Sequence, residues 1–312
     1  MYNLRKMMMG LRSVLLMELM ILLNIILAVK ATVAAADQAK PGCQSHCGDV
    51  TIPYPFGIGG HCNISEIFFI TCNNASIPNK AFLTTSDIEV VNISLDGQLR
   101  ILAKASYDCY NTLGRANNNS YWLQLAKFTI NQSRNKFTAI GCDTYARVEG
   151  YLGQRYAIGC LSLCNNFTDV TNGSCSGIGC CQTSIPKGVR SYNITLDSYD
   201  NHSDVLPENP CSYAFVAEDD AYNFNISNLG GYDFQDKEFP VTLDWTIGKI
   251  SCNEARNDTK NFACKENSTC VDSENSPGYL CKCFDGFEGN PYLSNGCQGN
   301  YIIDNCTFTS VN

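Results

Sequence analysis

Residues 47–62 read CGDVTIPYPFGIGGHC, in which two prolines are followed by Gly57, Gly59 and Gly60 between two cysteines. Proline fixes φ near −65° and favours an extended neighbour, so the prolines are expected to hold Tyr54 in an extended path. Glycine accepts positive φ without a steric penalty, so the three glycines permit a sharp return. The stretch therefore predicts a stiff segment and a tight reversal, stapled by cysteines at both ends.

Two aromatic residues, Tyr54 and Phe56, follow the two prolines. Their flat apolar faces are of the kind that stacks on sugar rings. The alternative is that both rings fill the small core of a disulfide-rich domain. The glycines do not indicate a phosphate-binding loop, because no Lys-Ser or Lys-Thr follows them and no helix is expected to begin there.

Residues 1–36 have the layout of a secretory signal peptide. Three basic residues precede an apolar run over residues 14–29, and Ala34–Ala36 provides an A-x-A cleavage site. An uncleaved anchor is disfavoured, because a run of 16 residues is short for a membrane span of about 20. No other stretch is long and apolar enough to cross a bilayer, so we expect a secreted, extracellular chain without a transmembrane helix.

All 19 cysteines follow the predicted signal peptide, which fits an oxidising compartment and a disulfide scaffold. Sequons for N-glycosylation are frequent, and in a secreted chain they predict a heavily glycosylated surface. The expected acceptors are Asn63, Asn74, Asn92, Asn118, Asn131, Asn166, Asn172, Asn193, Asn201, Asn225, Asn257 and Asn267. Asn305 is a poorer acceptor because Cys306 occupies the middle of its sequon.

The charge is negative overall and unevenly distributed. After the signal peptide, 18 basic and 29 acidic residues give a net charge of −11, which disfavours nucleic-acid binding. Residues 100–155 carry a net charge of +5, whereas residues 197–245 carry −10. Either the two segments attract each other within one domain, or the first forms a local basic surface for an acidic ligand.

Runs rich in β-branched and aromatic residues predict a mainly β fold, and Asp96-Gly97 reads as a hairpin turn. Polar stretches at 117–120 and 165–179 read as loops, and no long amphipathic helix is expected after the signal peptide. The predicted strand regions are 67–71, 88–95, 99–105, 121–130, 190–196, 211–217 and 239–245.

The cysteines fall into two even-numbered groups, twelve from Cys43 to Cys211 and six from Cys252 to Cys297, with Cys306 left over. The boundary between the groups is expected around residues 245–251. The second group resembles an EGF-like module in its spacing, its C-x-C pair and the FDGFEGNPY run at 284–292. A module of about 45 residues cannot bury enough apolar area to be stable without its bridges.

Spacing alone leaves all 15 connectivities of six cysteines open. The EGF resemblance implies the pairs Cys252–Cys270, Cys264–Cys281 and Cys283–Cys297. Residues 299–312 loosely resemble the opening of a second EGF-like module, which gives Cys306 a place.

The N-terminal stretch 41–62, PGCQSHCGDVTIPYPFGIGGHC, resembles the galacturonan-binding domain of plant wall-associated receptor kinases. The Gly179-Cys180-Cys181-Gln182 cluster and the order of domains are also similar. The resemblance implies a galacturonan-binding domain at 41–105, which is the N-terminal part of a cysteine-rich β ectodomain, the remainder of that ectodomain at 106–247 and an EGF-like module at 248–298. It thus implies a disulfide-rich antiparallel β fold.

The resemblance further implies non-catalytic binding of pectin, or oligogalacturonides, at the plant cell wall. The alternative is a protein-interaction or decoy ectodomain that contacts other cell-surface receptors through its EGF module. Family members continue into a second EGF module, a transmembrane helix and a cytoplasmic Ser/Thr kinase, and none of these segments appears in this sequence. We therefore expect no enzymatic activity and no cofactor.

No G-x-S-x-G, H-E-x-x-H or kinase signature is present. Carboxylates are plentiful, so counting does not exclude a glycosidase pair, but nothing in the sequence marks one. The group Cys43, Cys47, His46 and His61 could imitate a zinc site, but in the secretory pathway such cysteines are usually oxidised. Because a bond between the adjacent Cys180 and Cys181 would strain the intervening peptide, each is expected to bridge to a separate partner. We therefore predict no metal site.

A ligand that carries one carboxylate per sugar favours arginine, whose planar fork pairs with both carboxylate oxygens. Two alternatives stay open: the arginines pair with acids of 197–245, or calcium bridges protein carboxylates to pectin. The candidate contacts are Arg100, Arg115, Arg134, Arg147 and Arg155, with Tyr54 and Phe56 as stacking faces.

We predict that the EGF-like module does not bind calcium tightly. Residues 247–251 contain no carboxylate, and Asp272 offers one of the six to eight oxygen ligands that calcium needs. A calorimetric titration of residues 246–299 should detect no binding tighter than millimolar, and a tighter site would contradict the prediction.

Overall fold

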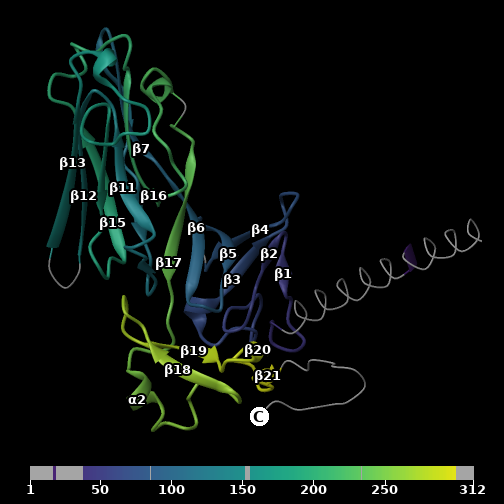
Figure 1. Ribbon diagram of the computed structural model, residues 1–312. Helices are drawn as coiled ribbons and strands as arrows, with labels where there is room; N and C mark the ends of the chain where they lie inside the picture. Colours follow the sequence, from purple (N-terminus) through teal and green to yellow (C-terminus); the bar gives the residue numbers. More distant parts are fainter. Residues whose placement is uncertain (1–16, 19–37, 85, 152–154, 233, 300–312) are drawn as a thin grey trace, which may run out of the picture.

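The computed structural model describes residues 17–18, 38–84, 86–151, 155–232 and 234–299. The predicted cleavage site, Cys306 and the proposed second EGF-like module lie outside the described residues. The molecule is elongated, with two sheets at one end, a third sheet in the middle and the EGF-like module at the other end (Figure 1). β17 (Glu238–Asp244) runs from the upper part into the middle sheet. The prediction of a mainly β, disulfide-rich antiparallel fold is confirmed.

The middle sheet has six antiparallel strands in the order β10-β17-β6-β5-β4-β3. Its β6 strand alternates, so that Leu99, Ile101 and Ala103 are buried while Arg100 is exposed, as a strand with one solvated face requires. Besides β17, its strands are β3 (Ile70–Asn73), β4 (Lys80–Leu83), β5 (Glu89–Ile93), β6 (Gln98–Lys104) and β10 (Thr129–Ile130).

Two further sheets form the upper part of the molecule. The five-stranded sheet has the order β14-β11-β16-β7-β8, and the four-stranded sheet has the order β13-β12-β15-β9. The strands of the first are β7 (Ser106–Asn111), β8 (Gly114–Asn119), β11 (Asn135–Ile140), β14 (Cys180–Ser184) and β16 (Cys211–Glu218). Those of the second are β9 (Trp122–Gln124), β12 (Asp143–Tyr151), β13 (Arg155–Leu163) and β15 (Ser191–Asp197).

The remaining elements are short. The strands β1 (His46–Cys47) and β2 (Val50–Thr51) pair with each other. The EGF-like module has the short helix α2 (Cys252–Ala255) and the hairpins β18 (Ser268–Asp272) with β19 (Tyr279–Cys283) and β20 (Phe287–Gly289) with β21 (Cys297–Gly299). The 3-10 turns are η1 (Glu66–Phe68), η2 (Phe167–Asp169) and η3 (Ile226–Leu229).

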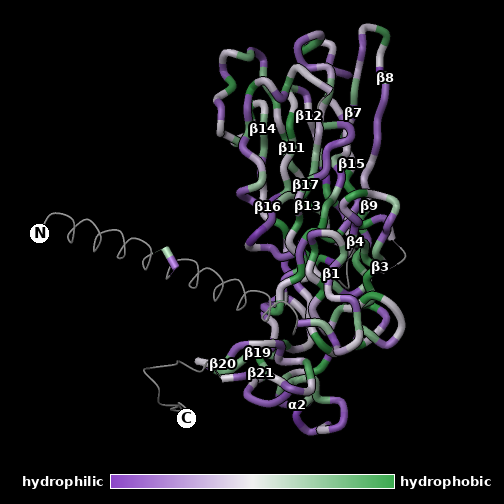
Figure 2. The backbone as a smooth tube through the Cα atoms, turned by 90° about the vertical axis from the view of Figure 1, so that its right-hand side faces the viewer, coloured by the Kyte–Doolittle hydropathy of each residue, from purple (hydrophilic) through white to green (hydrophobic). Residues whose placement is uncertain are grey.

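Some local predictions from the sequence were wrong. The region 121–130 is not one strand but two, β9 and β10, which belong to different sheets. Residues 117–119, predicted as loop, continue β8, which is hydrophilic along most of its length (Figure 2). Of the strands in the three large sheets, β4, β7, β8 and β11 to β14 were not predicted. Most of them pair through polar or small residues, which weakens the hydrophobic alternation.

The stretch 47–62 does not form a straight segment. The Tyr54–Pro55 bond is cis, and the Phe56 amide donates to the Pro53 carbonyl, so the chain turns at Tyr54. Gly57 is required by close approach, because a Cβ there would lie 2.3 Å from the Cys62 carbonyl group.

Phe56 is a core residue and not a stacking face for a ligand, because only 1% of it is exposed. Its ring centroid lies 4.9 Å from that of Phe68 and 5.4 Å from that of Trp245. Trp245 in turn lies 5.7 Å from Tyr292 of the EGF-like module. This aromatic cluster joins the middle sheet to the module, and the core-filling alternative for Phe56 holds.

The 18 described cysteines form nine disulfides, three of them the pairs that the EGF resemblance implies. The adjacent cysteines bridge separately, Cys180 to Cys175 and Cys181 to Cys160. The stretch 47–62 is not closed by its own two cysteines, because they bond to Cys72 and Cys43 respectively. The remaining pairs are Cys109–Cys211 and Cys142–Cys164.

Peptide mapping without reduction should recover these nine pairs, and a thiol label should react with Cys306 alone. A labelled cysteine among the other eighteen would contradict the framework.

Replacing Cys109 and Cys211 together by serine should lower the free energy of unfolding by about 2–5 kcal/mol. The matched control is the same double replacement at Cys175 and Cys180. Those cysteines are 5 residues apart instead of 102, so the loss of loop-closure entropy in the unfolded chain is smaller. Denaturant unfolding measures the free energy of unfolding of both double variants. An equal or larger cost for the short loop would contradict the argument.

Candidate functional site

A pocket of about 220 Å³ lies where the N-terminal segment meets the EGF-like module, and we call it the Tyr54 pocket. It contains Tyr54, one of the two predicted stacking residues, which is half-buried at the surface of the molecule. The lining residues are Tyr54, Ile64, Lys260, Asn261, Phe262, Ala263, Lys265 and Tyr292.

The main chain at Tyr54 is fixed by buried hydrogen bonds. The Tyr54 amide donates to the Gln38 carbonyl at 2.8 Å. The buried Asn290 of the EGF-like module donates from Nδ2 to the carbonyls of Tyr54 at 2.6 Å and Gln38 at 2.8 Å. One amide group therefore ties the module to the turn that presents the tyrosine. Asn290 belongs to the GNPY part of the EGF motif at 289–292. The motif predicts the module but not the contact of Asn290 with Tyr54.

The EGF-like module is held at a second place by polar contacts. Ile247 and Tyr279 exchange two backbone hydrogen bonds, and Asn275 Nδ2 donates to Asp244 Oδ2 at 2.6 Å. The hydroxyls of Thr129 and Ser276 lie 2.6 Å apart. Burial raises the pKa of Asp244, with the hydrogen bonds from Asn275 and Asn131 opposing that shift. Two separate attachments therefore position the module, one against the N-terminal segment and one against the middle sheet.

The Tyr54 pocket is positively charged. Among the described residues, Lys260 and Lys265 line it and no carboxylate does. Lys40 Nζ lies 6.0 Å from the centre of the Tyr54 ring, within the range of a cation–π contact. Burial raises the pKa of the Tyr54 hydroxyl, so the phenol stays protonated and can donate a hydrogen bond. The three lysines were not among the residues predicted from the sequence.

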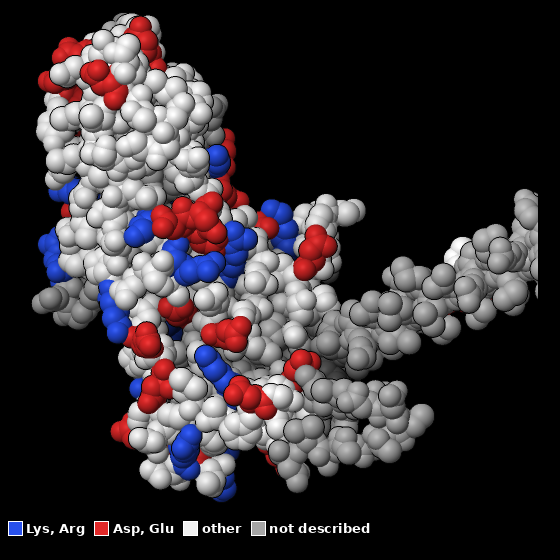
Figure 3. Space-filling view, in the orientation of Figure 1, with Lys and Arg blue, Asp and Glu red and all other residues white. Residues whose placement is uncertain are grey.

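A second pocket, of about 240 Å³, contains two of the predicted arginines, and we call it the Arg100 pocket. Acidic and basic side chains gather in the middle of the face that Figure 3 shows, where β6, β16 and β17 meet. Two cations and two acids line the pocket, so its charge nearly cancels. The lining residues are Asn92, Gln98, Arg100, Arg134, Glu218, Asp220 and Thr242.

The guanidinium of Arg100 is already occupied. Its Nε lies 2.9 Å from Glu218 Oε1 and its Nη2 lies 2.6 Å from Glu218 Oε2, a bidentate pair. Thr242 also donates to Glu218. Burial raises the pKa of Glu218, but the hydrogen bonds from Arg100 and Thr242 outweigh it and the net shift is downward.

The other predicted arginines do not gather on one site. Arg115 lies 2.9 Å from Asp108 and 3.7 Å from Asp197. Burial raises the pKa of Asp108 in spite of the opposing effects of Tyr110 and Arg115.

Arg147 and Arg155 both approach Glu149, at 3.6 and 3.7 Å. Arg134 forms no salt bridge within the described part of the chain. Pairing with the acidic 197–245 segment, the alternative weighed from the sequence, therefore occurs at Arg100 through Glu218 and at Arg115 through Asp197.

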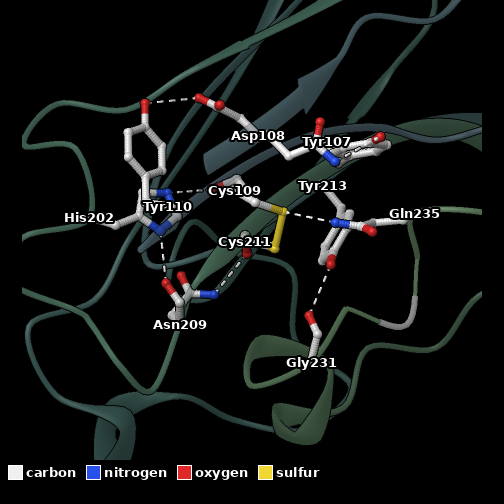
Figure 4. The surroundings of a disulfide bond; sticks show 12 residues. Tyr107, Asp108, Cys109, Tyr110, His202, Asn209, Cys211, Tyr213, Gly231 and Gln235 are labelled. Carbon is white, nitrogen blue, oxygen red and sulfur yellow. Dashed lines mark hydrogen bonds between the residues drawn. A yellow bond between two sulfur atoms is a disulfide. The ribbon is translucent and has the colours of Figure 1, made fainter. Parts of the chain in front are cut away.

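A serine–histidine pair is present but is structural. Ser212 Oγ lies 3.1 Å from His202 Nε2, and His202 Nδ1 lies 2.7 Å from the Asn209 carbonyl. Figure 4 shows His202 beside the ring of Tyr110, close to the Cys109–Cys211 disulfide. Both members of the pair are almost fully buried, so no substrate reaches the hydroxyl. Similarly, Cys43 and Cys47 of the zinc-like pattern are bound in disulfides.

Comparison with known proteins gives the family. The family described as "Wall-associated receptor kinase galacturonan-binding" matches residues 43–103, and the family described as "Wall-associated kinase" matches residues 172–252. In Arabidopsis thaliana, wall-associated receptor kinase 2 is 40% identical over 84% of this chain and 35% of its own length. Wall-associated receptor kinase 5 is 39% identical over 88% of this chain and 37% of its own length.

The Tyr54 pocket, the nine disulfides and these matches define a cysteine-rich β protein with an EGF-like module. The chain belongs to the wall-associated receptor kinase family. It spans a little over a third of the length of the relatives named above. No solved structure matches it. None of the helices in the described residues combines the length and apolar character that a membrane span requires.

Replacing Arg100 by glutamine should destabilise the protein at pH 7 by about 1–3 kcal/mol. This is less than the 3–5 kcal/mol typical of a fully buried pair, because the Arg100 side chain is 45% exposed. The lowered pKa of Glu218 contributes stability that is present above its ordinary pKa of about 4.3 and is lost as the pH falls through the folded value.

Thermal unfolding from pH 7 to pH 3 measures this effect. The difference in stability between wild type and Arg100→Gln should shrink as the pH falls, because a protonated Glu218 is neutral and needs no cation beside it. The matched control is Lys80→Gln, because Lys80 pairs with Glu89 at the surface. A stability difference between wild type and Arg100→Gln that does not change with pH would contradict the proposed role of the Arg100–Glu218 pair.

Proposed function

We propose that the chain is a non-catalytic extracellular module that binds polygalacturonate of pectin in the plant cell wall, and that the Tyr54 pocket holds a uronate unit. The observation that carries the proposal is the pocket itself, in which a half-buried tyrosine lies among lysines and none of the described lining residues is a carboxylate. Support also comes from the position of Tyr54 within the segment that matches a galacturonan-binding family.

The chemistry of the pocket suits an anionic sugar. The tyrosine ring offers an apolar face to the C–H groups of a sugar ring and a hydroxyl to its oxygens. Lys260 and Lys265 offer ammonium groups to the uronate carboxylate as point charges, without the fixed geometry of an arginine fork. The ligand is expected to lie between the N-terminal segment and the EGF-like module.

The negative net charge of the protein does not prevent such binding. Charges separated by more than about 8 Å are largely screened at physiological ionic strength. A polyanion at the surface therefore responds to the groups that it touches and to little else. The Arg100 pocket is less suitable in the absence of calcium, because Glu218 and Asp220 offset its two arginines.

We also propose that the signal peptide is cleaved, that the sequons carry glycans and that the protein is exported. Nine disulfides suit an oxidising compartment. The chain then serves as a ligand-binding ectodomain, without catalysis of its own.

Binding of oligogalacturonides to the folded chain tests the function and the site together. The double variant Lys260→Glu/Lys265→Glu should weaken binding at least about tenfold, which is about 1.4 kcal/mol. Tyr54→Ala should also weaken it, whereas Lys282→Glu is the matched control, because Lys282 is exposed in the same module and does not line the pocket. Binding should weaken as salt is added and should persist in a calcium chelator.

Other outcomes would point elsewhere. Charge reversal at Arg134, Arg147 or Arg155 could abolish binding while the lysine variants bind normally. That result would place the site at the arginines. Abolition by chelator would indicate calcium bridging to acidic groups. No binding to pectin at any salt concentration, together with capture of a receptor, would support the protein-interaction alternative and overturn the proposal.

A further inference from the structure

The outer face of the four-stranded sheet carries an exposed tryptophan beside a glycosylation sequon. In β15 the residues Tyr192 and Ile194 point into the core, so Asn193 between them faces outward. In β9 the side chain of Leu123 is buried, whereas Trp122 is 65% exposed. Both outward residues therefore lie on the same face of the sheet.

These two residues are direct cross-strand partners. β15 and β9 pair antiparallel with Asn193 opposite Trp122. Side chains at such positions have Cβ atoms about 4.5–5.5 Å apart. Any group attached to the Asn193 amide is thus delivered next to the indole.

The Asn193 amide is available for modification. Asn193-Ile194-Thr195 is an N-x-T sequon. The Asn193 side chain makes no hydrogen bond within the described residues. By contrast, the amides of Asn131 and Asn267 donate to Asp244 and to the Cys297 carbonyl. Asn193 is therefore better placed for a glycan than these two asparagines.

The exposure of Trp122 calls for a covering group. Tryptophan is usually highly buried, because its ring is the largest apolar surface that a residue offers. Trp122 makes no ring-stacking or cation–π contact in the described part of the chain. It also belongs to a short edge strand, where unpaired backbone groups invite pairing with other chains.

We propose that Trp122 is an intramolecular carbohydrate-binding site, on which the first N-acetylglucosamine of a glycan at Asn193 stacks. In glycosylation Asn193 Nδ2 loses a proton and bonds to C1 of the sugar, while the lipid diphosphate of the donor leaves. The sugar then covers one face of the indole and the edge of β9. This site is independent of the proposed pectin site, because neither residue lines the Tyr54 pocket.

Tryptophan fluorescence reports this contact directly. The chain has two tryptophans, and Trp245 is 1% exposed, so quenching by acrylamide reports Trp122. For this experiment the full chain is expressed as a secreted protein in eukaryotic cells. Mass spectrometry then gives the fraction of molecules that carry a glycan at Asn193. The folded glycoprotein is then compared with two enzymatically treated forms. An endoglycosidase leaves the first sugar on the asparagine, and an amidase removes the whole glycan.

The quenching constant should stay unchanged after the endoglycosidase and rise about twofold after the amidase, because stacking covers one of the two faces of the ring. Asn193→Gln should behave like the amidase-treated form without the carboxylate that the amidase creates. Asn257→Gln is the matched control, because it removes a sequon from the EGF-like module and should leave quenching unchanged. An unmodified Asn193, or equal quenching in all forms, would overturn the proposal.

Discussion

The ring of Trp245 lies between the middle sheet and the EGF-like module, and the rest of the architecture depends on its burial. It contacts Phe56 on one side and Tyr292 on the other, at centroid distances of 5.4 and 5.7 Å. Its Nε1 donates to the Ser94 carbonyl at 3.1 Å, so the one polar atom of the ring is satisfied. Burial of these rings replaces a flexible linker by a packed junction, and the Tyr54 pocket lies along that junction.

The same junction explains why a rigid pocket can form from residues far apart in the chain. The turn at Tyr54 and the segment with Lys260 and Lys265 each belong to a disulfide-stapled unit. Asn290 joins the two units through the Tyr54 carbonyl. Because these groups are ordered before a ligand arrives, binding does not have to include the entropy cost of ordering them. The EGF-like module is therefore part of the candidate site and not only a spacer.

The sequence predicted the features that local patterns encode. The cysteine spacing indicated the EGF-like module, and the alternation in β6 and β17 indicated strands with one buried face. The sequence could not separate Tyr54 from Phe56, because which ring enters the core depends on the turn between them. It also missed Lys260 and Lys265, since nothing in a local pattern places them beside a tyrosine some 200 residues earlier. Tertiary contacts decide such neighbours.

The two kinds of cation in this protein have different neighbours, so the positive net charge of a segment does not by itself locate a cationic surface that is free of acidic partners. Arg100 on β6 and Glu218 at the end of β16 connect two sheets through a bidentate pair. The acidic 197–245 segment therefore supplies partners that orient guanidinium groups, and the Nε–Nη2 edge of Arg100 is no longer free to form a bidentate pair with a ligand carboxylate. The lysines at the module junction share their pocket with no carboxylate from the described part of the chain, so their charge remains available to an anion.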